Sequence, residues 1–340
     1  MSRTEPTPQA LARQAEMLGN RVKKTFDRLK GVMSREAVDC FRLYDRDIPE
    51  IRAVVDWYAG HVVVGEYTRT LTEQWPEWLP AMTQAVGAAL GVPPDRLHCK
   101  IRRTGDRGER YERLDRQEQR IQVREGPTRL LVNLDDYLDT GLFNDHRKTR
   151  KMVAAEAVDR TFLNLFCYTG TFTVAAALAG AKATTSVDAS GRYLQWLRDN
   201  LACNGLDQNQ LGNAQPPKVF HETVRADTRD FLRLALRNGQ RWDVIFCDPP
   251  SFSARPDAPP WEVQRDHRDL VLTCLEVLRP GGVLWFSSNH QRFFPDLQDL
   301  PGCVAVEMTE RTVPADYRNK QVHRVWRMAK GPGAGETPLA

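Results

Sequence analysis

The sequence predicts an α/β protein: a mostly parallel sheet with helices on its faces, preceded by a smaller α+β domain. Two observations support this. From residue 137 onward, short apolar runs alternate with amphipathic helical segments, as in chains that build parallel sheets. Before that point, several short strand-like runs surround one helical segment. At 340 residues the chain is long enough for two domains, each with its own core.

Four segments are expected along the chain. Residues 1–39 hold a basic amphipathic helix, because apolar residues recur at helical spacing between 8 and 30. Residues 40–134 form the small α+β domain, and residues 135–329 form the Rossmann-like domain. Residues 330–340 are rich in glycine and proline and are expected to be a disordered tail.

The small domain is predicted to contain one helix and several strands. The helix, 75–90, ends at Gly91 and Pro93, which are typical stop signals. Its strands are expected at 41–44, 53–58, 61–67, 97–101, 120–124 and 128–133.

The larger domain is predicted to alternate strands and helices. Strands are expected at 162–166, 183–188, 218–226, 243–247, 283–287 and 303–309, with a last, antiparallel strand at 322–328. Helices are expected at 173–178, 192–204, 228–238 and 263–278.

Composition favours a soluble protein of the cytoplasm. Hydrophobic residues make up 41% and charged residues 27%. No apolar run approaches the roughly 20 residues that span a bilayer, and the first residues lack the apolar core of a signal peptide. The seven cysteines are scattered singly without a CxxC pair, so no metal site is predicted. The sequence makes no prediction of an oligomeric state.

Basic residues gather in two stretches although the net charge is only +4. The candidates for contact with nucleic acid are Lys23, Lys24, Arg28, Arg102 and Arg103. In the second stretch, arginines between 102 and 124 are interleaved with acidic residues. A solvated, salt-bridged surface is therefore an equally good interpretation of that stretch.

The most informative motif is Asp248-Pro249-Pro250, which ends the apolar run 243–247. Neither a central strand nor a helix continues through two prolines, so the chain must turn there. In open α/β sheets, ligands bind at the carboxyl ends of the strands. Asp248 is therefore a candidate site residue, with ordinary turn chemistry as the alternative.

The turn after the first strand of the larger domain, 164–170, contains a single glycine, Gly170. A dinucleotide site needs three glycines so that the backbone can approach a pyrophosphate. One small residue suffices for S-adenosylmethionine, which has no phosphate. Asp188 and Asp227 end the next two strands and could accept hydrogen bonds from ribose hydroxyls and an adenine amino group. Helix capping is the alternative for both, although Ser190 is available to cap the helix after Asp188.

Asp145 and Arg147 precede the first strand of the larger domain. Asp145 could cap a helix. It could instead receive the ammonium group of the donor, while Arg147 pairs with the carboxylate. No chemistry is assigned to His146, which lies between them.

These motifs resemble the guanine-N7 methyltransferase module of the bacterial bifunctional 23S rRNA large-subunit methyltransferase. The resemblance extends over about 18–329 and includes CFRLYDRDIPE, VNLDDYLDTGLFNDHR, NLFCYTGTFTVAAALAGA, VDASGRYLQWLRDNLACNGL, DVIFCDPPSF, VQRDH and RNKQVHRVW. The family's additional guanine-N2 methyltransferase and RNA-binding module have no counterpart here, so a stand-alone version is expected.

The resemblance implies a class I S-adenosylmethionine-dependent methyltransferase fold, a seven-stranded Rossmann-like sheet whose last strand is antiparallel. It implies 23S rRNA or an assembling large ribosomal subunit as the partner, with the small domain helping to hold the RNA. The implied donor contacts are Asp145, Arg147, Asn164, Phe166, Tyr168, Thr169, Gly170, Asp188, Ala189, Asp227, Thr228 and Asp248.

The chemistry around Asp248 also favours guanine N7. Cytosine-C5 transfer needs a cysteine thiolate, but Cys247 lies inside the predicted strand and should point away from Asp248. Base-amino enzymes usually place an aromatic directly after the two prolines, whereas position 251 is Ser and Phe252 comes one residue later. Guanine N7 has a lone pair and needs only orientation, so activity should be flat from mildly acidic to neutral pH.

Asp248, Pro249 and Phe252 are the expected catalytic positions, with Phe252 and the proline-rich loop 255–261 as candidates to stack on and cover a flipped guanine. Cytosine-C5 and base-amino enzymes on the same fold remain alternatives. A nicotinamide-dependent oxidoreductase is disfavoured by the missing glycines. A non-catalytic RNA-binding module is disfavoured because the strand-end carboxylates are all present.

Overall fold

The computed structural model describes residues 7–67, 75–102, 118–206, 220–255 and 258–331; at 102, 254, 255, 258 and 259 it describes the backbone alone. The chain divides into two compact units. Unit 1 comprises Met1–Asn144 with Ala315–Asn319, and unit 2 comprises Asp145–Pro314 with Lys320–Ala340. Unit 1 thus includes the segment 135–144, which the sequence analysis placed with the larger domain. The expected tail lies outside the described residues from 332 onward.

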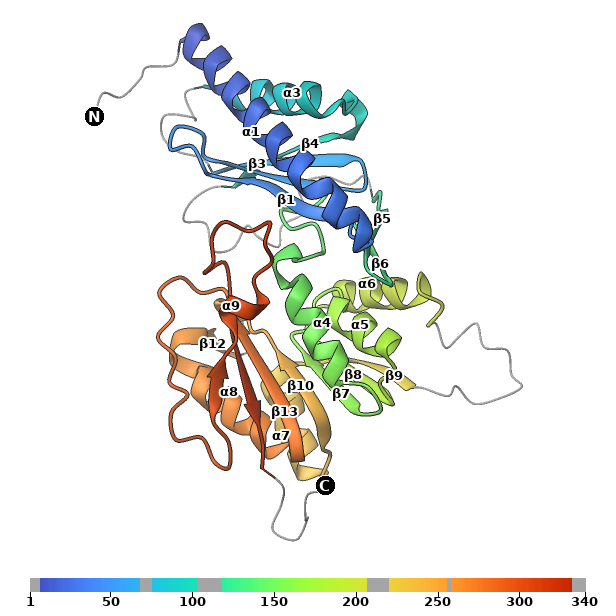
Figure 1. The fold of residues 1–340 in the computed structure, drawn as a ribbon. Helices are drawn as coiled ribbons and strands as arrows, with labels where there is room; N and C mark the ends of the chain where they lie inside the picture. Colours follow the sequence, from blue (N-terminus) through green and yellow to red (C-terminus); the bar gives the residue numbers. More distant parts are fainter. Residues whose placement is uncertain (1–6, 68–74, 103–117, 207–219, 256–257, 332–340) are drawn as a thin grey trace. The chain divides into compact units, whose positions relative to one another are not determined.

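Unit 1 is an α+β module (Figure 1). Its helices are α1 (Pro8–Arg35), α3 (Trp78–Leu90) and the 3-10 helix η1 (Pro94–Arg96), and its strands are β1 (Cys40–Asp45), β2 (Ala53–Tyr58), β3 (His61–Tyr67), β4 (Leu97–Arg102), β5 (Ile121–Glu125) and β6 (Thr128–Val132). Strands β1 to β4 form one sheet in chain order, with β3 and β4 parallel, and β5 pairs with β6 as a separate hairpin.

Helix α1 covers the sheet of unit 1 together with α3 (Figure 1). Its buried residues Leu18, Val22, Leu29 and Met33 recur at helical spacing, which is why this segment is a helix and why one face packs inward. Thr7 caps its first turn by accepting a hydrogen bond from the Ala10 backbone. The helix runs to Arg35, five residues beyond the predicted end.

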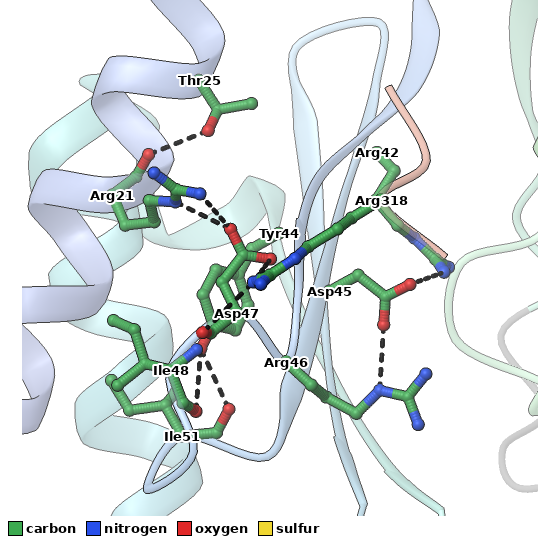
Figure 2. Close-up of polar contacts among 10 residues, drawn as sticks. All are labelled: Arg21, Thr25, Arg42, Tyr44, Asp45, Arg46, Asp47, Ile48, Ile51 and Arg318. Atoms are coloured by element: carbon green, nitrogen blue, oxygen red, sulfur yellow. Dashed lines mark hydrogen bonds and ion pairs between the residues drawn. The ribbon is translucent and has the colours of Figure 1, made fainter. Parts of the chain in front are cut away.

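A short segment from late in the chain, Ala315–Asn319, belongs to unit 1. Figure 2 shows Arg318 beside Asp47, which also accepts a 2.7 Å hydrogen bond from Arg21 of α1. Asp316 accepts a hydrogen bond from the Arg42 backbone, and the Arg42 guanidinium lies 4.6 Å from the centre of the Tyr317 ring. Three consecutive residues of this segment therefore bind to the β1 region of unit 1.

Unit 2 is built on a seven-stranded sheet of order β14-β15-β13-β10-β7-β8-β9 (Figure 1). Its strands are β7 (Thr161–Leu165), β8 (Ala183–Asp188), β9 (Phe220–Arg225), β10 (Trp242–Cys247), β13 (Leu278–Ser288), β14 (Ala305–Glu307) and β15 (Arg324–Ala329). Strand β15 is antiparallel to both β13 and β14, and the other neighbours are parallel. The predicted sheet with its antiparallel last strand is confirmed.

Helices pack on both faces of this sheet. They are η3 (Asn144–His146), α4 (Arg147–Glu156), α5 (Thr171–Ala179), α6 (Gly191–Ala202), α7 (Thr228–Arg237), α8 (Val263–Glu276) and α9 (Thr309–Thr312). Residues of β10 alternate between the two core layers: Val244 and Phe246 pack with α4 and α5, and Ile245 and Cys247 pack with α7 and α8. Of the helices in the described ranges, none combines the length and apolar character needed to cross a membrane.

One predicted loop is a hairpin. The proline-rich segment 255–261 was expected to be a loop, but β11 (Phe252–Arg255) pairs with β12 (Ala258–Glu262), and Trp261 is buried. The indole N–H of Trp261 donates a 2.7 Å hydrogen bond to the Pro250 carbonyl. This tertiary contact, which local sequence does not reveal, fixes the segment directly after Asp248.

Candidate active site

The predicted site residues of unit 2 gather at one edge of the sheet, where parallel strands end. The turn 166–170 follows β7, Asp188 ends β8, Asp227 follows β9 and Asp248 follows β10. Because parallel neighbouring strands present their carboxyl ends on the same side, these groups share the edge at which open α/β sheets bind ligands.

The turn after β7 is held in an uncommon backbone conformation. Phe166 and Tyr168 have φ values of 53° and 52°, and Gly170 has 75°. A Cβ at Gly170 would lie 2.2 Å from Cγ of Leu197 on α6, so the position excludes any side chain. The turn therefore brings its backbone against α6 at the sheet edge.

Asp188 joins this turn to the loop after β8. Its Oδ2 accepts a 3.0 Å hydrogen bond from the Tyr168 backbone, and its Oδ1 accepts one of 2.8 Å from the Ser190 backbone. Ser190 caps α6, as its sequence position suggested it could. Each oxygen of a carboxylate can accept more than one hydrogen bond, so Asp188 combines a structural role with acceptor capacity at the edge.

Asp227 is the N-cap of α7, where its Oδ1 accepts hydrogen bonds from the Arg229 and Asp230 backbones at 2.8 and 3.3 Å. Helix capping, the alternative given for Asp227 in the sequence analysis, is therefore observed. Thr228 beside it is buried. Both of these capping hydrogen bonds use Oδ1 of Asp227. The adenine-binding role of Asp227 stays a prediction.

Of three other predicted donor contacts, Asn164 and Thr169 are buried and Ala189 is exposed. The amide of Asn164 is 1% exposed and donates to Thr173, whose hydroxyl lies 2.7 Å from that of Ser186, so this side chain bonds inside the core. Thr169 is also buried, and its carbonyl accepts from Asn200. Ala189 is exposed beside Asp188.

Asp248 lies half-buried between Cys247 and the buried Pro249. Burial raises the pKa of its carboxyl to about 6, while a hydrogen bond from Ser287 and the charge of His323 oppose the shift and Asp145 adds to it. The preceding Cys247 is fully buried in the opposite core layer, and burial beside Cys274 raises the pKa of its thiol well above its usual range. The strand alternation predicted for this pair is thus observed.

A cluster of imidazoles and carboxylates lies next to Asp248. His323 Nδ1 is 2.8 Å from Oδ2 of Asp145, and His146 stacks on His323 with ring centres 4.1 Å apart. Three possible metal-ligand atoms, one from each residue, lie within 4.8 Å of one another. His323 and Asp145 also contact each other directly at hydrogen-bond distance.

The N-cap position of α4 is His146, one residue after Asp145. Asp145 lies in the preceding η3 turn and is largely buried, whereas Arg147 is half-buried at the first position of α4.

Sequence reasoning missed the roles of His323, Ser287 and Trp261. His323 lies in the RNKQVHRVW stretch and Ser287 near the end of the strand beside β10, and these positions were the available signals.

A family model for S-adenosylmethionine-dependent methyltransferases matches residues 48–318. The chain belongs to this family. The donor of the methyltransferase is therefore S-adenosylmethionine. The site is compatible with that donor, because its narrow turn at Gly170 and its strand-end carboxylates suit a phosphate-free nucleoside that carries cationic groups.

The methyltransferase is also similar to curated proteins named ribosomal RNA large subunit methyltransferase K/L. It is 43% identical to the protein of Alcanivorax borkumensis over 91% of the chain and 43% of that protein, and 40% identical to that of Pseudomonas putida over 94% of the chain and 43% of that protein. The chain thus spans less than half the length of these relatives.

Solved structures share the fold. SMU.776, crystallised as a complex with SAH, has a TM-score of 0.69 at 22% identity, with coverage of 93% of this chain and 81% of that one. A SAM-dependent methyltransferase structure from Streptococcus mutans gives a TM-score of 0.71 at 23% identity with the same coverage.

The turn at Gly170 gives a first testable prediction. Gly170→Ala should destabilise the methyltransferase by about 2–4 kcal/mol, because it adds left-handed backbone strain to a clash with Leu197. Gly180→Ala is the matched control, since Gly180 also has positive φ (101°) but no atom within 4 Å of its Cβ position. Urea unfolding of both variants measures the difference. Equal losses would show that close packing of the turn against α6 is unimportant.

The basic candidates of unit 1 lie on one helix and one strand. Lys23, Lys24 and Arg28 are exposed on α1, and Lys23 also pairs with Asp27 at 2.5 Å. Arg102 ends β4, but its side chain and all of Arg103 lie outside the described residues. Most of the arginine-rich stretch that follows is outside them as well.

Proposed function

We propose that this methyltransferase transfers a methyl group to N7 of a guanine in 23S rRNA, as naked RNA or in an assembling large subunit. The observation that supports this most directly is which chemical groups lie at the sheet edge beside Asp248. It offers a carboxylate and a fixed backbone, while the neighbouring thiol of Cys247 is buried on the other side of the sheet with a raised pKa. The names of the relatives favour ribosomal RNA as the substrate class. Such a substrate agrees with the expected location in the cytoplasm.

In this proposal the strand-end groups hold the donor. Asp188 accepts from the ribose hydroxyls, Asp227 with Thr228 faces the adenine, and the turn 166–170 lies along the nucleoside. Asp145 and Arg147 face the amino-acid end. S-adenosylmethionine supplies a methyl group on a positively charged sulfur, which an oriented lone pair can attack without a base.

Asp248 would offset the positive charge that the guanine gains when N7 is methylated. Pro249 and Pro250 keep the carboxylate in place, since Trp261 fixes the Pro250 carbonyl. Phe252 begins β11 half-buried and is the proposed stacking partner of the base. Trp261 is too deeply buried to share that role, because it packs near Phe166 with ring centres 6.2 Å apart.

The alternatives from the same fold differ in what they require. A cytosine-C5 enzyme needs a thiolate, but burial raises the pKa of the Cys167 thiol as well as that of Cys247. A base-amino enzyme would use Phe252 as its stacking aromatic, which keeps that alternative as the second candidate.

The product and the cysteines test the proposal together. The expected product is 7-methylguanosine in 23S rRNA, found by mass spectrometry of nuclease digests after reaction with rRNA from cells that lack the gene. Single replacements by Ser should leave turnover within several-fold, apart from packing losses, at Cys167, Cys203, Cys247, Cys274 and Cys303. Finding 5-methylcytidine, or one cysteine whose loss abolishes transfer in a folded variant, would overturn the proposal in favour of C5 chemistry. A methylated exocyclic amine would favour the base-amino candidate.

Basic residues of α1 are proposed to contact phosphates. Replacing Lys23, Lys24 and Arg28 together by Ala should flatten the plot of log affinity against log salt by about 0.7–0.9 per lost contact. Filter binding to 23S rRNA at several salt concentrations measures this. The charge-matched control removes the exposed Lys182, Arg233 and Arg237 of unit 2. If both triple variants keep the wild-type slope, α1 presents a solvated face; the double replacement of Arg102 and Arg103 then tests the second stretch.

A further inference from the structure

His146 lies beside Asp248 in the η3 turn and is 3% exposed. Its Nε2 is 3.8 Å from Oδ2 of Asp248 and 3.4 Å from Oγ of Ser287. Ser287 is fully buried on β13, and its interaction with the Asp248 carboxyl lowers the pKa of that group. The imidazole Nε2 therefore lies within 4 Å of both the Asp248 carboxylate and the Ser287 hydroxyl.

The surroundings of His146 favour one tautomer. Its Nδ1 lies 3.2 Å from the hydroxyl of Thr149, which can donate or accept, whereas its Nε2 faces Ser287 and the carboxylates of Asp145 and Asp248. A proton on Nε2 puts the donor toward these acceptors. Burial, followed by the neighbouring His323 and Arg150, lowers the pKa of His146 well below its usual range despite Asp145.

A second imidazole keeps the first in position. His323 stacks on His146 with an angle of 11° between the rings, and both of its nitrogens have partners: Nδ1 bonds Asp145 at 2.8 Å, and Nε2 lies 3.2 Å from the Thr312 hydroxyl. The rings of Phe172 and Phe246 lie edge-on to His146, with centres 5.8 and 6.2 Å away. Rotation of His146 would break two hydrogen bonds and disturb three ring contacts.

We propose that His146 is a positioning residue for methyl transfer: its ring, together with Ser287, holds Asp248 in place, and the Asp145–His323 pair fixes the ring. Buried polar groups are costly unless they are hydrogen-bonded, and the groups of this cluster bond to one another beside one carboxylate. The inference rests on the proposed function in one respect, that Asp248 faces the target base.

Two conservative variants separate positioning from packing. His146→Asn keeps an amide near Nδ1 and loses the group at Nε2, whereas His146→Gln keeps an amide near Nε2. In single-turnover assays with saturating donor and rRNA from cells lacking the gene, His146→Asn should slow transfer by roughly 10- to 100-fold. His146→Gln should recover most of that loss. The affinity of both variants for S-adenosylhomocysteine should match wild type.

Combined variants show whether the two residues act as a unit. In an Asp248→Asn background, His146→Asn should cause no further loss of rate, because its effect passes through Asp248. Ser287→Ala should reproduce the loss without altering either imidazole, and it keeps the test open if the His146 variants fail to fold. His267→Asn is the matched control, since His267 is equally buried on α8 but bonds Val263 and the Asp296 backbone. It should leave transfer by folded protein unchanged.

Equal rates for His146→Asn and His146→Gln, additive losses with Asp248→Asn, or normal transfer by Ser287→Ala would each overturn the proposal. A loss of donor affinity with an unchanged transfer rate would also overturn it, by making His146 part of the donor site. Failure of the proposed function is read separately, from the identity of the wild-type product. The single-turnover ratios do not depend on which base atom is methylated.

Discussion

Replacing Asp248 by Asn should slow single-turnover methyl transfer by roughly 100-fold or more, while the affinity for S-adenosylhomocysteine changes little. The reason is that a positive charge develops on the guanine in the proposed reaction, and a preorganised carboxylate favours that charge only as it forms. Rapid-quench assays with saturating donor, together with calorimetric titration, separate the two effects. Normal transfer with weakened donor binding would make Asp248 a donor-binding residue and no more.

The same replacement should stabilise the protein. Burial raises the pKa of Asp248 from 3.8 to about 6, so between these pH values the folded state binds more protons than the unfolded state. Stability therefore falls as pH rises through this window, and above pH 6 the ionised carboxylate costs about 1–3 kcal/mol. Asp248→Asn removes that cost and should raise Tm by a few degrees at pH 8.

Asp243, at the other end of β10, is the matched control. Burial raises its pKa, but hydrogen bonds from Thr161 and an ion pair with Arg279 outweigh burial and lower the pKa overall. Asp243→Asn should therefore lower Tm at pH 8 and leave transfer by folded protein intact. A fall in Tm for both variants would contradict the role of burial at Asp248.

The raised pKa also changes the pH dependence expected from the sequence. Wild-type transfer should be flat above about pH 6 and fall below it as Asp248 takes up a proton and loses its charge. The profile in mildly acidic solution is thus set by a charge-stabilising carboxylate, not by a base that removes a proton from guanine.

The second large effect is expected at Asp188. Asp188→Ala should weaken S-adenosylhomocysteine binding by one to two orders of magnitude, corresponding to about 1–3 kcal/mol, because the ribose hydroxyls would lose the acceptor proposed for them. The Tyr168 backbone also loses its partner, which loosens the turn after β7. Calorimetric titration measures the change.

Asp230→Ala is the control for Asp188→Ala. Asp230 is also an aspartate of unit 2, but its side chain is exposed and pairs with Arg233. Its donor affinity should equal wild type. Unchanged affinity in Asp188→Ala, with the protein folded, would reduce Asp188 to the structural role visible in its two backbone hydrogen bonds.

The sequence by itself determined the larger architecture. Periodic apolar runs separated by helical segments give the order of strands and helices in unit 2, because burial on both faces of a parallel sheet requires such runs. The Asp-Pro-Pro motif located the end of β10, since prolines cannot continue a central strand. Strand ends in turn placed Asp188, Asp227 and Asp248 on one edge.

Only the tertiary structure decided which groups surround Asp248. His323 is 178 residues from Asp145 along the chain, and Ser287 is 141 residues from His146, so no local pattern predicts either pair. Likewise, the hairpin β11–β12 depends on Trp261 reaching Pro250, and local propensity indicated a loop there. Local periodicity reports burial, whereas hydrogen-bond partners depend on which strands become neighbours. That choice is made by packing of the whole unit, and it determines the environment of the Asp248 carboxylate.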